Sequence, residues 1–242
     1  MEAIKIENLT KRYGDITAVS DLSLSVKRGE LFSLLGVNGA GKTTTIKMLC
    51  CLTPPTGGDA YLLGKSILRE SQAVKAIIGV CPQETAVARG LSVRENLELI
   101  AGVHGFSREK QREKIRELTA LLGLEDVIDR RAGKLSGGWQ RRLSIAMALI
   151  SEPEILFLDE PTLGLDVLAR SDLWDIIRAL KGRVTVILTT HYMEEAEALS
   201  DRIAILRDGK LLCCDTAEKI KEMAGTEKFE EAFVRIVRGV KQ

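Results

Sequence analysis

The chain has 242 residues, of which 45% are hydrophobic, 29% charged and 4% aromatic, and its formal net charge is +1. This length and hydrophobic content suffice to bury one large core or two modest ones. The charge balance lacks the basic excess that a dedicated nucleic-acid binder carries, so we expect no nucleic-acid partner.

The N-terminal segment and the cysteines bear on the compartment. Residues 1–13 lack the charged segment followed by an apolar segment that is typical of a signal peptide. No apolar run approaches the roughly eighteen residues that a membrane span needs. The five cysteines, at positions 50, 51, 81, 213 and 214, include no Cys-x-x-Cys pair of the kind used for zinc or redox work. We expect reduced thiols without a functional role, in a cytoplasmic protein that meets a membrane only through a partner.

The first third of the sequence predicts strands around one helix. Residues 4–30 have a strand-like pattern with turns at 13–15 and 27–29, and the apolar run 31–35 indicates a buried strand. A Pro- and Gly-rich segment at 53–58 interrupts regular structure, and a short strand is expected at 60–63.

The segment that follows the buried strand matches the phosphate-binding P-loop pattern in full. Its glycines let backbone N–H groups converge on phosphate oxygens, and the helix opening near Lys42 points its positive dipole end at the same anion. Lys42 would reach the β- and γ-phosphates and Thr43 would hold Mg²⁺; the alternative is a glycine-rich turn without a ligand. The nucleotide-binding residues predicted here are Gly36, Val37, Asn38, Gly39, Ala40, Gly41, Lys42, Thr43 and Thr44.

The middle of the chain changes to helical patterns, and we expect a helical insertion at 84–132. Ser92 with Glu95 forms a predicted capping box, and Ser107 can cap a longer helix. The charged run 108–117 is expected to be a solvated helix face rather than a binding arm. Apolar residues fall on one face of the longer helix, namely Ile115, Leu118, Leu121 and Leu122.

Ser136, Gly137 and Gly138 precede an apolar helix expected at 143–150. A hydroxyl group and two glycines at a helix start form an anion site by themselves, although the same residues equally make a capped loop. This segment suggests a second phosphate-binding surface in a chain that has one P-loop.

The last third predicts alternating strands and helices. Buried parallel strands are expected at 155–158 and 184–188 with a helix at 168–180 between them. A hairpin at 202–214, turning at 208–209, and a mostly helical tail at 218–237 follow. The order of elements predicts an α/β fold with a P-loop and a parallel sheet.

Two acidic residues and a histidine follow these buried strands. Ligands of open α/β sheets lie beyond the carboxyl ends of the strands, so Asp159 and Glu160 should arrive beside the P-loop. Asp159 suits Mg²⁺ opposite Thr43, and Glu160 is placed to polarise a water in line with the γ-phosphate. His191 should reach the same edge and bind a terminal phosphate or that water. The alternative for the carboxylates is a surface turn, and His104, inside the insertion, is expected to have no role.

Taken together, these residues resemble the ATP-binding cassette family of transporter ATPases from about residue 4 to residue 238. Residues 36–43 match its Walker A motif, 156–160 its Walker B motif with the catalytic glutamate, and 135–138 its signature motif. Tyr13 falls where the family stacks an aromatic ring on adenine, Gln83 resembles the Q-loop residue, 164–166 the D-loop and His191 the switch histidine.

The resemblance implies one cassette over residues 1–242, with ATP and Mg²⁺ as its cofactors. It implies a P-loop core at about 1–83 and 151–216 with an N-terminal antiparallel β subdomain, an inserted helical subdomain at about 84–150, and a tail at 217–242. The catalytic residues would be Glu160, His191, Gln83 and Lys42, and the magnesium ligands Thr43, Gln83 and Asp159. Two cassettes would dimerise head to tail, so that Ser136, Gly137 and Gly138 of one contact the γ-phosphate held by the other.

At the fifth signature position this chain has Trp139, where glutamine is usual in the family. The segment 138–143 and the tail residues 230–233 nevertheless resemble the branch that serves small two-component exporters of drugs, antibiotics, lipids, polysaccharides or sodium. We therefore expect a homodimer or heterodimer of cassettes on the inner face of the cell membrane, bound to separate permease subunits that contact the exported small molecule, lipid or ion. No additional regulatory domain is expected. The alternatives are a soluble family member acting on ribosomes, DNA or cofactor assembly, an importer ATPase, and a non-hydrolysing regulator.

Overall fold

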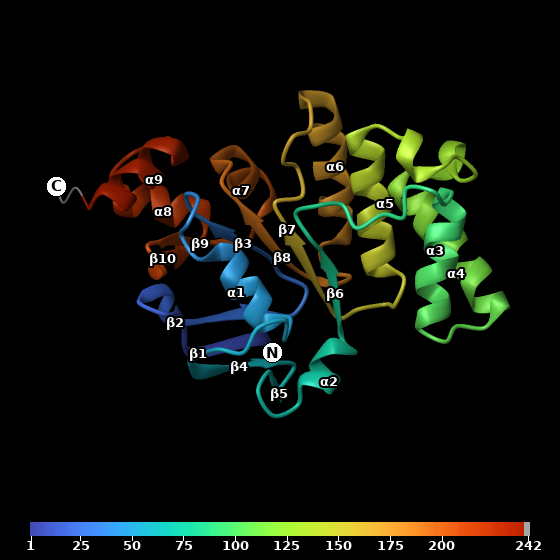
Figure 1. Cartoon of the computed structure of the whole chain (residues 1–242). Coiled ribbons are helices and arrows are strands. Elements are labelled where there is room, and N and C mark those ends of the chain that lie inside the picture. The colour runs from blue at the N-terminus through green and yellow to red at the C-terminus, as the bar shows by residue number, and fades with distance from the viewer. Residues whose placement is uncertain (240–242) are drawn as a thin grey trace.

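The computed structural model describes residues 1–239 and arranges them around two β-sheets (Figure 1). A six-stranded sheet has the strand order β10-β9-β3-β8-β7-β6, and a four-stranded antiparallel sheet has the order β2-β1-β4-β5. The strands are β1 (Glu2–Tyr13), β2 (Ile16–Lys27), β3 (Leu31–Leu35), β4 (Gly57–Leu62), β5 (Lys65–Ser66), β6 (Ile78–Cys81), β7 (Ile155–Asp159), β8 (Thr185–Thr190), β9 (Arg202–Arg207) and β10 (Lys210–Asp215). The α-helices are α1 (Lys42–Leu49), α2 (Ser71–Lys75), α3 (Val93–Val103), α4 (Arg108–Leu122), α5 (Gly137–Leu149), α6 (Val167–Leu180), α7 (Met193–Leu199), α8 (Ala217–Ala224) and α9 (Phe229–Arg238).

The larger sheet is parallel except at one edge. β3 pairs in parallel with β8 and β9, β7 pairs in parallel with β6 and β8, and β10 runs antiparallel to β9. Every residue of β3, β7 and β8 is buried, which explains why these strands are apolar runs without alternation. The carboxyl ends of the three strands lie at one edge of the sheet, so the residues that follow them meet there.

Successive side chains of the central strands pack on opposite faces of the sheet. Leu156 and Leu158 of β7 pack into a core with α5 and α6, whereas Phe157 packs with α1 and the antiparallel sheet. A third core joins β3 and β9 to α7, α8 and α9 through residues such as Ile203 and Phe233. The predicted α/β fold with a parallel sheet and an antiparallel partner sheet is confirmed.

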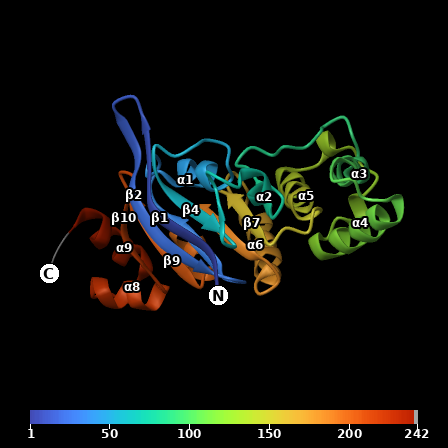
Figure 2. The ribbon, with the colours of Figure 1, turned by 90° about the horizontal axis from the view of Figure 1, so that it is seen from below.

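Helices α3, α4 and α5 form the part of the molecule that lies farthest from β1 and β2 (Figure 2). The predicted capping box at α3 is present: Ser92 Oγ accepts from the N–H of Glu95 at 3.2 Å, and Glu95 Oε2 accepts from the N–H of Ser92 at 2.7 Å. The predicted cap of α4 is present as well, since Ser107 Oγ accepts from the N–H of Lys110. Of the apolar residues predicted on one face of α4, Ile115, Leu118 and Leu122 are buried and Leu121 is half-buried.

Several predicted boundaries were wrong. α5 begins at Gly137 rather than at 143, because its polar first two turns hide the helical pattern. β4 begins at Gly57, inside the segment predicted to be irregular, because Gly58 adopts a φ of 73° beside a register shift against β1. Residues 84–91 of the predicted helical insertion are irregular, since the buried amide of Asn96 hydrogen-bonds to the backbone of Ala88.

The short elements β5, β6, α2 and α7 had no sequence signal strong enough to predict them. The predicted strands around 31–35, 155–158 and 184–188, the hairpin that turns at 208–209 and the helical tail are all present. Residues 240–242 of the expected tail lie outside the described residues. Within residues 1–239, no helix combines the length and the apolar character needed to cross a bilayer.

Candidate nucleotide site

The P-loop connects β3 to α1 and bends sharply at its glycines. Gly39 and Gly41 have φ values of 83° and 97°, and Gly41 is the N-cap of α1. A Cβ atom on Gly41 would lie 2.5 Å from the carbonyl oxygen of Ala18, so no side chain fits there. The loop is therefore pressed against β2, and the N–H groups at the start of α1 are directed as an anion site.

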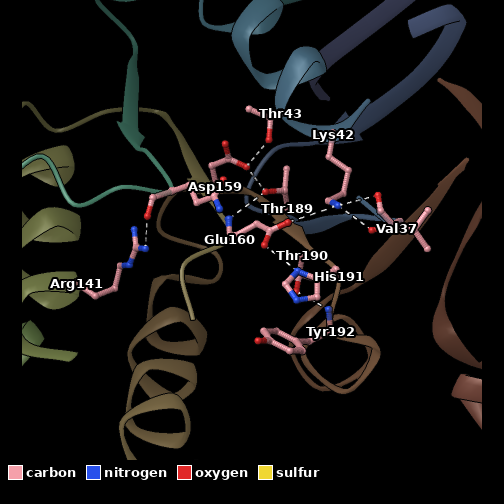
Figure 3. Close-up of polar contacts among 12 residues, drawn as sticks. Val37, Lys42, Thr43, Arg141, Asp159, Glu160, Thr189, Thr190, His191 and Tyr192 are labelled. Atoms are coloured by element: carbon pink, nitrogen blue, oxygen red, sulfur yellow. Dashed lines mark hydrogen bonds and ion pairs between the residues drawn. The ribbon is translucent and has the colours of Figure 1, made fainter. Parts of the chain in front are cut away.

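The side chain of Lys42, which is 5% exposed, folds back over this loop (Figure 3). Its Nζ donates to the carbonyl oxygens of Gly36 at 2.7 Å and Val37 at 3.3 Å, and it lies 3.5 Å from Oε1 of Glu160. The ammonium group thus lies between the P-loop and the end of β7, where it can neutralise a phosphate.

Asp159 is the last residue of β7 and is buried below the P-loop helix. Its Oδ1 accepts hydrogen bonds from the hydroxyl groups of Thr43 at 3.3 Å and Thr189 at 2.5 Å (Figure 3). Hydroxyl and carboxylate oxygens are the hard ligands that Mg²⁺ prefers, and such sites use few protein groups together with phosphate oxygens. The donor set of Thr43 and Asp159 therefore fits a magnesium ion beside a bound triphosphate.

Glu160 has an unusual backbone conformation directly after β7. Its φ is 46°, in the left-handed region that costs a non-glycine residue of order 1–3 kcal/mol. Its N–H is held by Thr189, with the hydroxyl oxygen at 3.0 Å and the carbonyl oxygen at 3.1 Å. The turn aims the carboxylate at His191, whose Nδ1 lies 2.7 Å from Oε2, while Oε1 faces Lys42.

A cavity of about 790 Å³ opens between the P-loop, the first hairpin and the ends of β7 and β8. Its predicted lining residues are Tyr13, Asn38, Gly39, Ala40, Gly41, Lys42, Thr43, Thr44, Gln83, Glu160 and His191. Gly36, Val37 and Asp159 support the cavity from below through the contacts given above. The structure thus brings residues from five distant parts of the sequence to one site.

Five further residues line the cavity and were not predicted, namely Ile16, Thr17, Ala18, Leu163 and Asp208. Two residues that support the site from behind were not predicted either. Arg141 of α5, which is 4% exposed, donates from Nη1 to the carbonyl oxygen of Pro82 at 2.7 Å and from Nη2 to that of Gln83 at 2.5 Å. It anchors the chain where Gln83 enters the cavity. Thr189 supports Asp159 and Glu160 from the neighbouring strand. An arginine inside an apolar helix was the available signal for Arg141, whereas a threonine in a β-strand gives none.

The predicted signature residues lie elsewhere. Ser136 is the exposed N-cap of α5, and its side chain makes no capping bond. Gly137 and Gly138 follow it in the first turn, where no acidic residue is present. None of the three lines the P-loop cavity of their own chain. Their neighbours are instead Leu165, in the loop before α6, and Ala169 of α6.

The cysteines and His104 stand apart from this geometry. All five thiols are free, and burial raises the pKa of each of them, so few are ionised at neutral pH. For Cys213 the pKa rises to about 11. His104 is the C-cap of α3 and does not line the nucleotide cavity.

The fold and the site together define a P-loop nucleotide-binding protein. Residues 19–163 match the sequence profile of the ABC transporter family. The chain is 41% identical over 229 residues to the daunorubicin resistance ATP-binding protein DrrA3 of Streptomyces coeruleorubidus, which covers 94% of this chain and 72% of that protein. It also matches the dimeric structure of a bacterial ABC transporter cassette, with a TM-score of 0.78 and 30% identity over 88% of this chain and 98% of that one. The chain belongs to the ABC transporter family, as an ATP-binding cassette.

Some relatives are much longer than this chain. The human phospholipid-transporting ATPase ABCA3 is 43% identical over 226 residues, which are 92% of this chain but only 13% of that protein. The chain therefore corresponds to one cassette of such a relative.

Proposed function

We propose that this chain is the ATP-hydrolysing subunit of a membrane exporter and that it works as a dimer. The observation that carries the hydrolytic part is the carboxylate of Glu160, which lies 2.7 Å from Nδ1 of His191 and 3.5 Å from Nζ of Lys42 in the P-loop cavity. A buried carboxylate beside a phosphate-binding lysine and an imidazole is an arrangement suited to activating water at a γ-phosphate.

The predicted residues of the site have proposed parts in binding. Tyr13 stacks on the adenine ring, the P-loop N–H groups and Lys42 hold the phosphates, and Thr43, Asp159 and Gln83 hold Mg²⁺. When bound, Mg²⁺ would neutralise charge on the phosphate oxygens. Thr189 keeps Asp159 oriented by donating to its Oδ1.

Glu160 and His191 have the proposed catalytic parts. Glu160 accepts a proton from the attacking water, and His191 orients the carboxylate through its Nδ1 and faces the terminal phosphate with the rest of its ring. Lys42 neutralises the charge that develops on the phosphate oxygens. Water is the co-reactant, and the products are ADP and inorganic phosphate.

The exposed signature segment supports a dimer. Ser136, Gly137 and Gly138 form a helix start without a capping bond or an acidic first turn, and they lie outside the P-loop cavity of their own chain. We infer that they contact the γ-phosphate held by a second cassette, identical or different. The solved relative is a dimer, which supports this inference.

The membrane partner would be a separate multi-span permease on whose cytoplasmic face the cassettes lie. We propose that residues 83–91 receive a short helix of this permease, because the segment is irregular and partly exposed. A cavity of about 270 Å³ beside it is lined by Pro82, Ala86, Ile100 and Met147 among others, which gives a helix an apolar contact. The drug-resistance and phospholipid-transporting relatives favour export of an amphipathic small molecule or lipid.

The test is the Glu160→Gln variant. Its ATP binding should be retained, and its phosphate release should fall by about 10²- to 10⁴-fold because the general base is lost. Glu113→Gln, a change at an exposed glutamate of α4, is the matched control. Hydrolysis near the wild-type rate in Glu160→Gln would rule out the assigned base.

The same variant, tagged and solubilised in mild detergent with Mg-ATP, identifies the partner by mass spectrometry. A stoichiometric multi-span membrane protein supports the exporter. Co-purification of ribosomal proteins, DNA-binding factors or an assembly scaffold would instead support the alternative of a soluble family member.

A further inference from the structure

Three buried polar side-chain atoms within residues 1–239 have no hydrogen-bond partner, and they belong to one cluster. They are Oγ1 of Thr162, Nε of Arg170 and Oε2 of Glu195. Thr162, Arg170 and Thr190 all face the carboxyl group of Glu195. Buried polar groups without a well-formed hydrogen bond are uncommon, and a cluster of them indicates a constraint other than stability. This cluster lies where α6 meets α7, and its Thr162 and Thr190 are close in sequence to Glu160 and His191.

Glu195 is fully buried in the first turn of α7 and takes one hydrogen bond from α6. Nε1 of Trp174 donates to its Oε1 at 3.1 Å, and the hydroxyl groups of Thr162 and Thr190 lie close to the carboxyl group. Burial raises the pKa of this carboxyl group. An apolar residue would fill the same space without the cost of burying an acid, so the polar contacts are what a glutamate provides here, and the bond from Trp174 is the one that reaches α6.

A second contact of α6 reaches Tyr192, the residue between His191 and α7. The guanidinium of Arg170 in α6 lies 5.0 Å from the centroid of the Tyr192 ring, in cation–π contact. The Tyr192 ring in turn packs on the ring of His191 with centroids 4.1 Å apart. His191 contacts Glu160 (Figure 3). Helix α6 therefore touches both the residue that follows His191 and the helix that continues from it.

The other side of α6 contacts the signature segment. A Cβ atom on Gly138 would lie 3.2 Å from the Cβ of Ala169, so the two helices approach closely there. One turn further along, Nη2 of Arg142 and Oδ2 of Asp172 form an ion pair at 2.7 Å. α6 is thus the element in contact with both the signature segment and the loop of His191.

We propose that Trp174 and Glu195 are positioning residues: their hydrogen bond fixes α7 on α6 and thereby holds His191 against Glu160. This inference rests on the proposed ATPase function. Neither residue lines the nucleotide cavity, so neither should contact the nucleotide. Loss of the bond lets the imidazole leave its position beside Glu160 while the P-loop stays intact.

The test uses two disruptive variants and one conservative variant. Glu195→Leu removes the acceptor at similar volume, Trp174→Phe removes the donor but keeps an aromatic ring, and Glu195→Gln keeps an acceptor oxygen for the indole. Glu194→Leu, at the exposed neighbour in the same helix turn, is the matched control. For each, kcat, the affinity for ATP and the ring-proton NMR resonances of His191 are measured. The chain has two histidines, so His104→Gln assigns the signals.

Both disruptive variants should lower kcat about 10- to 100-fold, as misplaced catalytic groups do, with ATP affinity unchanged. Their His191 resonances should shift because the packing on Tyr192 is loosened. Glu195→Gln and Glu194→Leu should resemble the wild type in all three readouts. Unchanged His191 resonances in both Glu195→Leu and Trp174→Phe would overturn the proposal, as would an equal loss of kcat in Glu195→Gln.

The proposed ATPase function and the proposed positioning role of Trp174 and Glu195 can be refuted independently. Wild-type protein that binds ATP but releases no phosphate would refute the proposed ATPase. The His191 resonances would still show whether Trp174 and Glu195 position the imidazole.

Discussion

Replacing Arg141 with methionine removes the only side-chain donors that reach the carbonyl oxygens of Pro82 and Gln83 among the described residues. This residue joins α5 to the chain that leaves β6 and enters the nucleotide cavity. The substitution keeps an unbranched apolar stem in the buried position and deletes the guanidinium. It therefore tests one specific link between the helical part of the molecule and the site.

The expected change in the free energy of unfolding follows from three contributions. The hydrogen bonds at 2.7 Å and 2.5 Å come from a charged donor, and each such bond contributes about 1.5–3 kcal/mol, or about 3–6 kcal/mol together. Burying the charged guanidinium costs several kcal/mol, and the hydrogen bonds offset only part of this cost. Methionine does not have this cost. Gln83 is an exposed residue, so water can reach this segment once the guanidinium is removed. We expect a net loss of about 1–3 kcal/mol in the free energy of unfolding, which lowers Tm by roughly 2–12 °C for a chain of this size.

Urea unfolding followed by circular dichroism measures this loss, and ATP titration measures the effect on the site. Because Gln83 loses its anchor, we expect Arg141→Met to bind Mg-ATP more weakly. Arg116→Met, at an exposed arginine of α4, should change stability by less than about 0.5 kcal/mol. Should Arg141→Met unfold at the same urea concentration as Arg116→Met and bind ATP like the wild type, the anchoring argument is wrong.

Two further predictions concern buried side chains beside the site. Thr189→Val removes the hydroxyl that donates to Asp159 and accepts from the N–H of Glu160, so we expect about 1–3 kcal/mol less stability in urea and weaker magnesium-dependent ATP binding. Burial raises the pKa of Glu195, so its contribution to stability is complete below the ordinary value near 4.5 and is lost as the pH rises toward the folded pKa. Glu195→Gln should therefore be more stable than the wild type at pH 8, and the difference should shrink at pH 4; an equal difference at both pH values would contradict this.

The sequence predicted the parts of the site that depend on local pattern and on one rule of sheet topology. The P-loop is a contiguous strand, loop and helix, so its residues identify it without any tertiary information. Asp159, Glu160 and His191 were predicted beside it because parallel strands end at the same edge of a sheet. The structure does place Glu160 and His191 at one cavity with Lys42 and Gln83, and it places Asp159 behind that cavity in contact with Thr43.

The contacts that support these residues could not be predicted in the same way. Arg141 reaches the Gln83 carbonyl across 58 positions of sequence, and the orientation of α5 that allows this is a product of packing in the helical core. The Trp174–Glu195 bond joins a helix that was predicted to one, α7, that was not. Helix α7 has only seven residues and an acidic first turn, so its sequence shows too little helical periodicity to predict it. In the structure, α6 and β3 nevertheless bury one side of this helix.

The signature segment packs against α6, and this contact has a consequence for the proposed dimer. Gly137 contacts the loop before α6 and Gly138 contacts α6 itself, whereas the far part of α6 holds α7 through Trp174. If a phosphate on a second cassette draws Ser136 and its helix start inward, we expect α6 to follow, because a close-packed contact of this kind transmits displacement. The His191 loop of the same chain then moves with it. In the proposed dimer, each cassette would in this way adjust the position of its own His191 according to the nucleotide bound by its partner, and hydrolysis at the two sites would be coupled through α6.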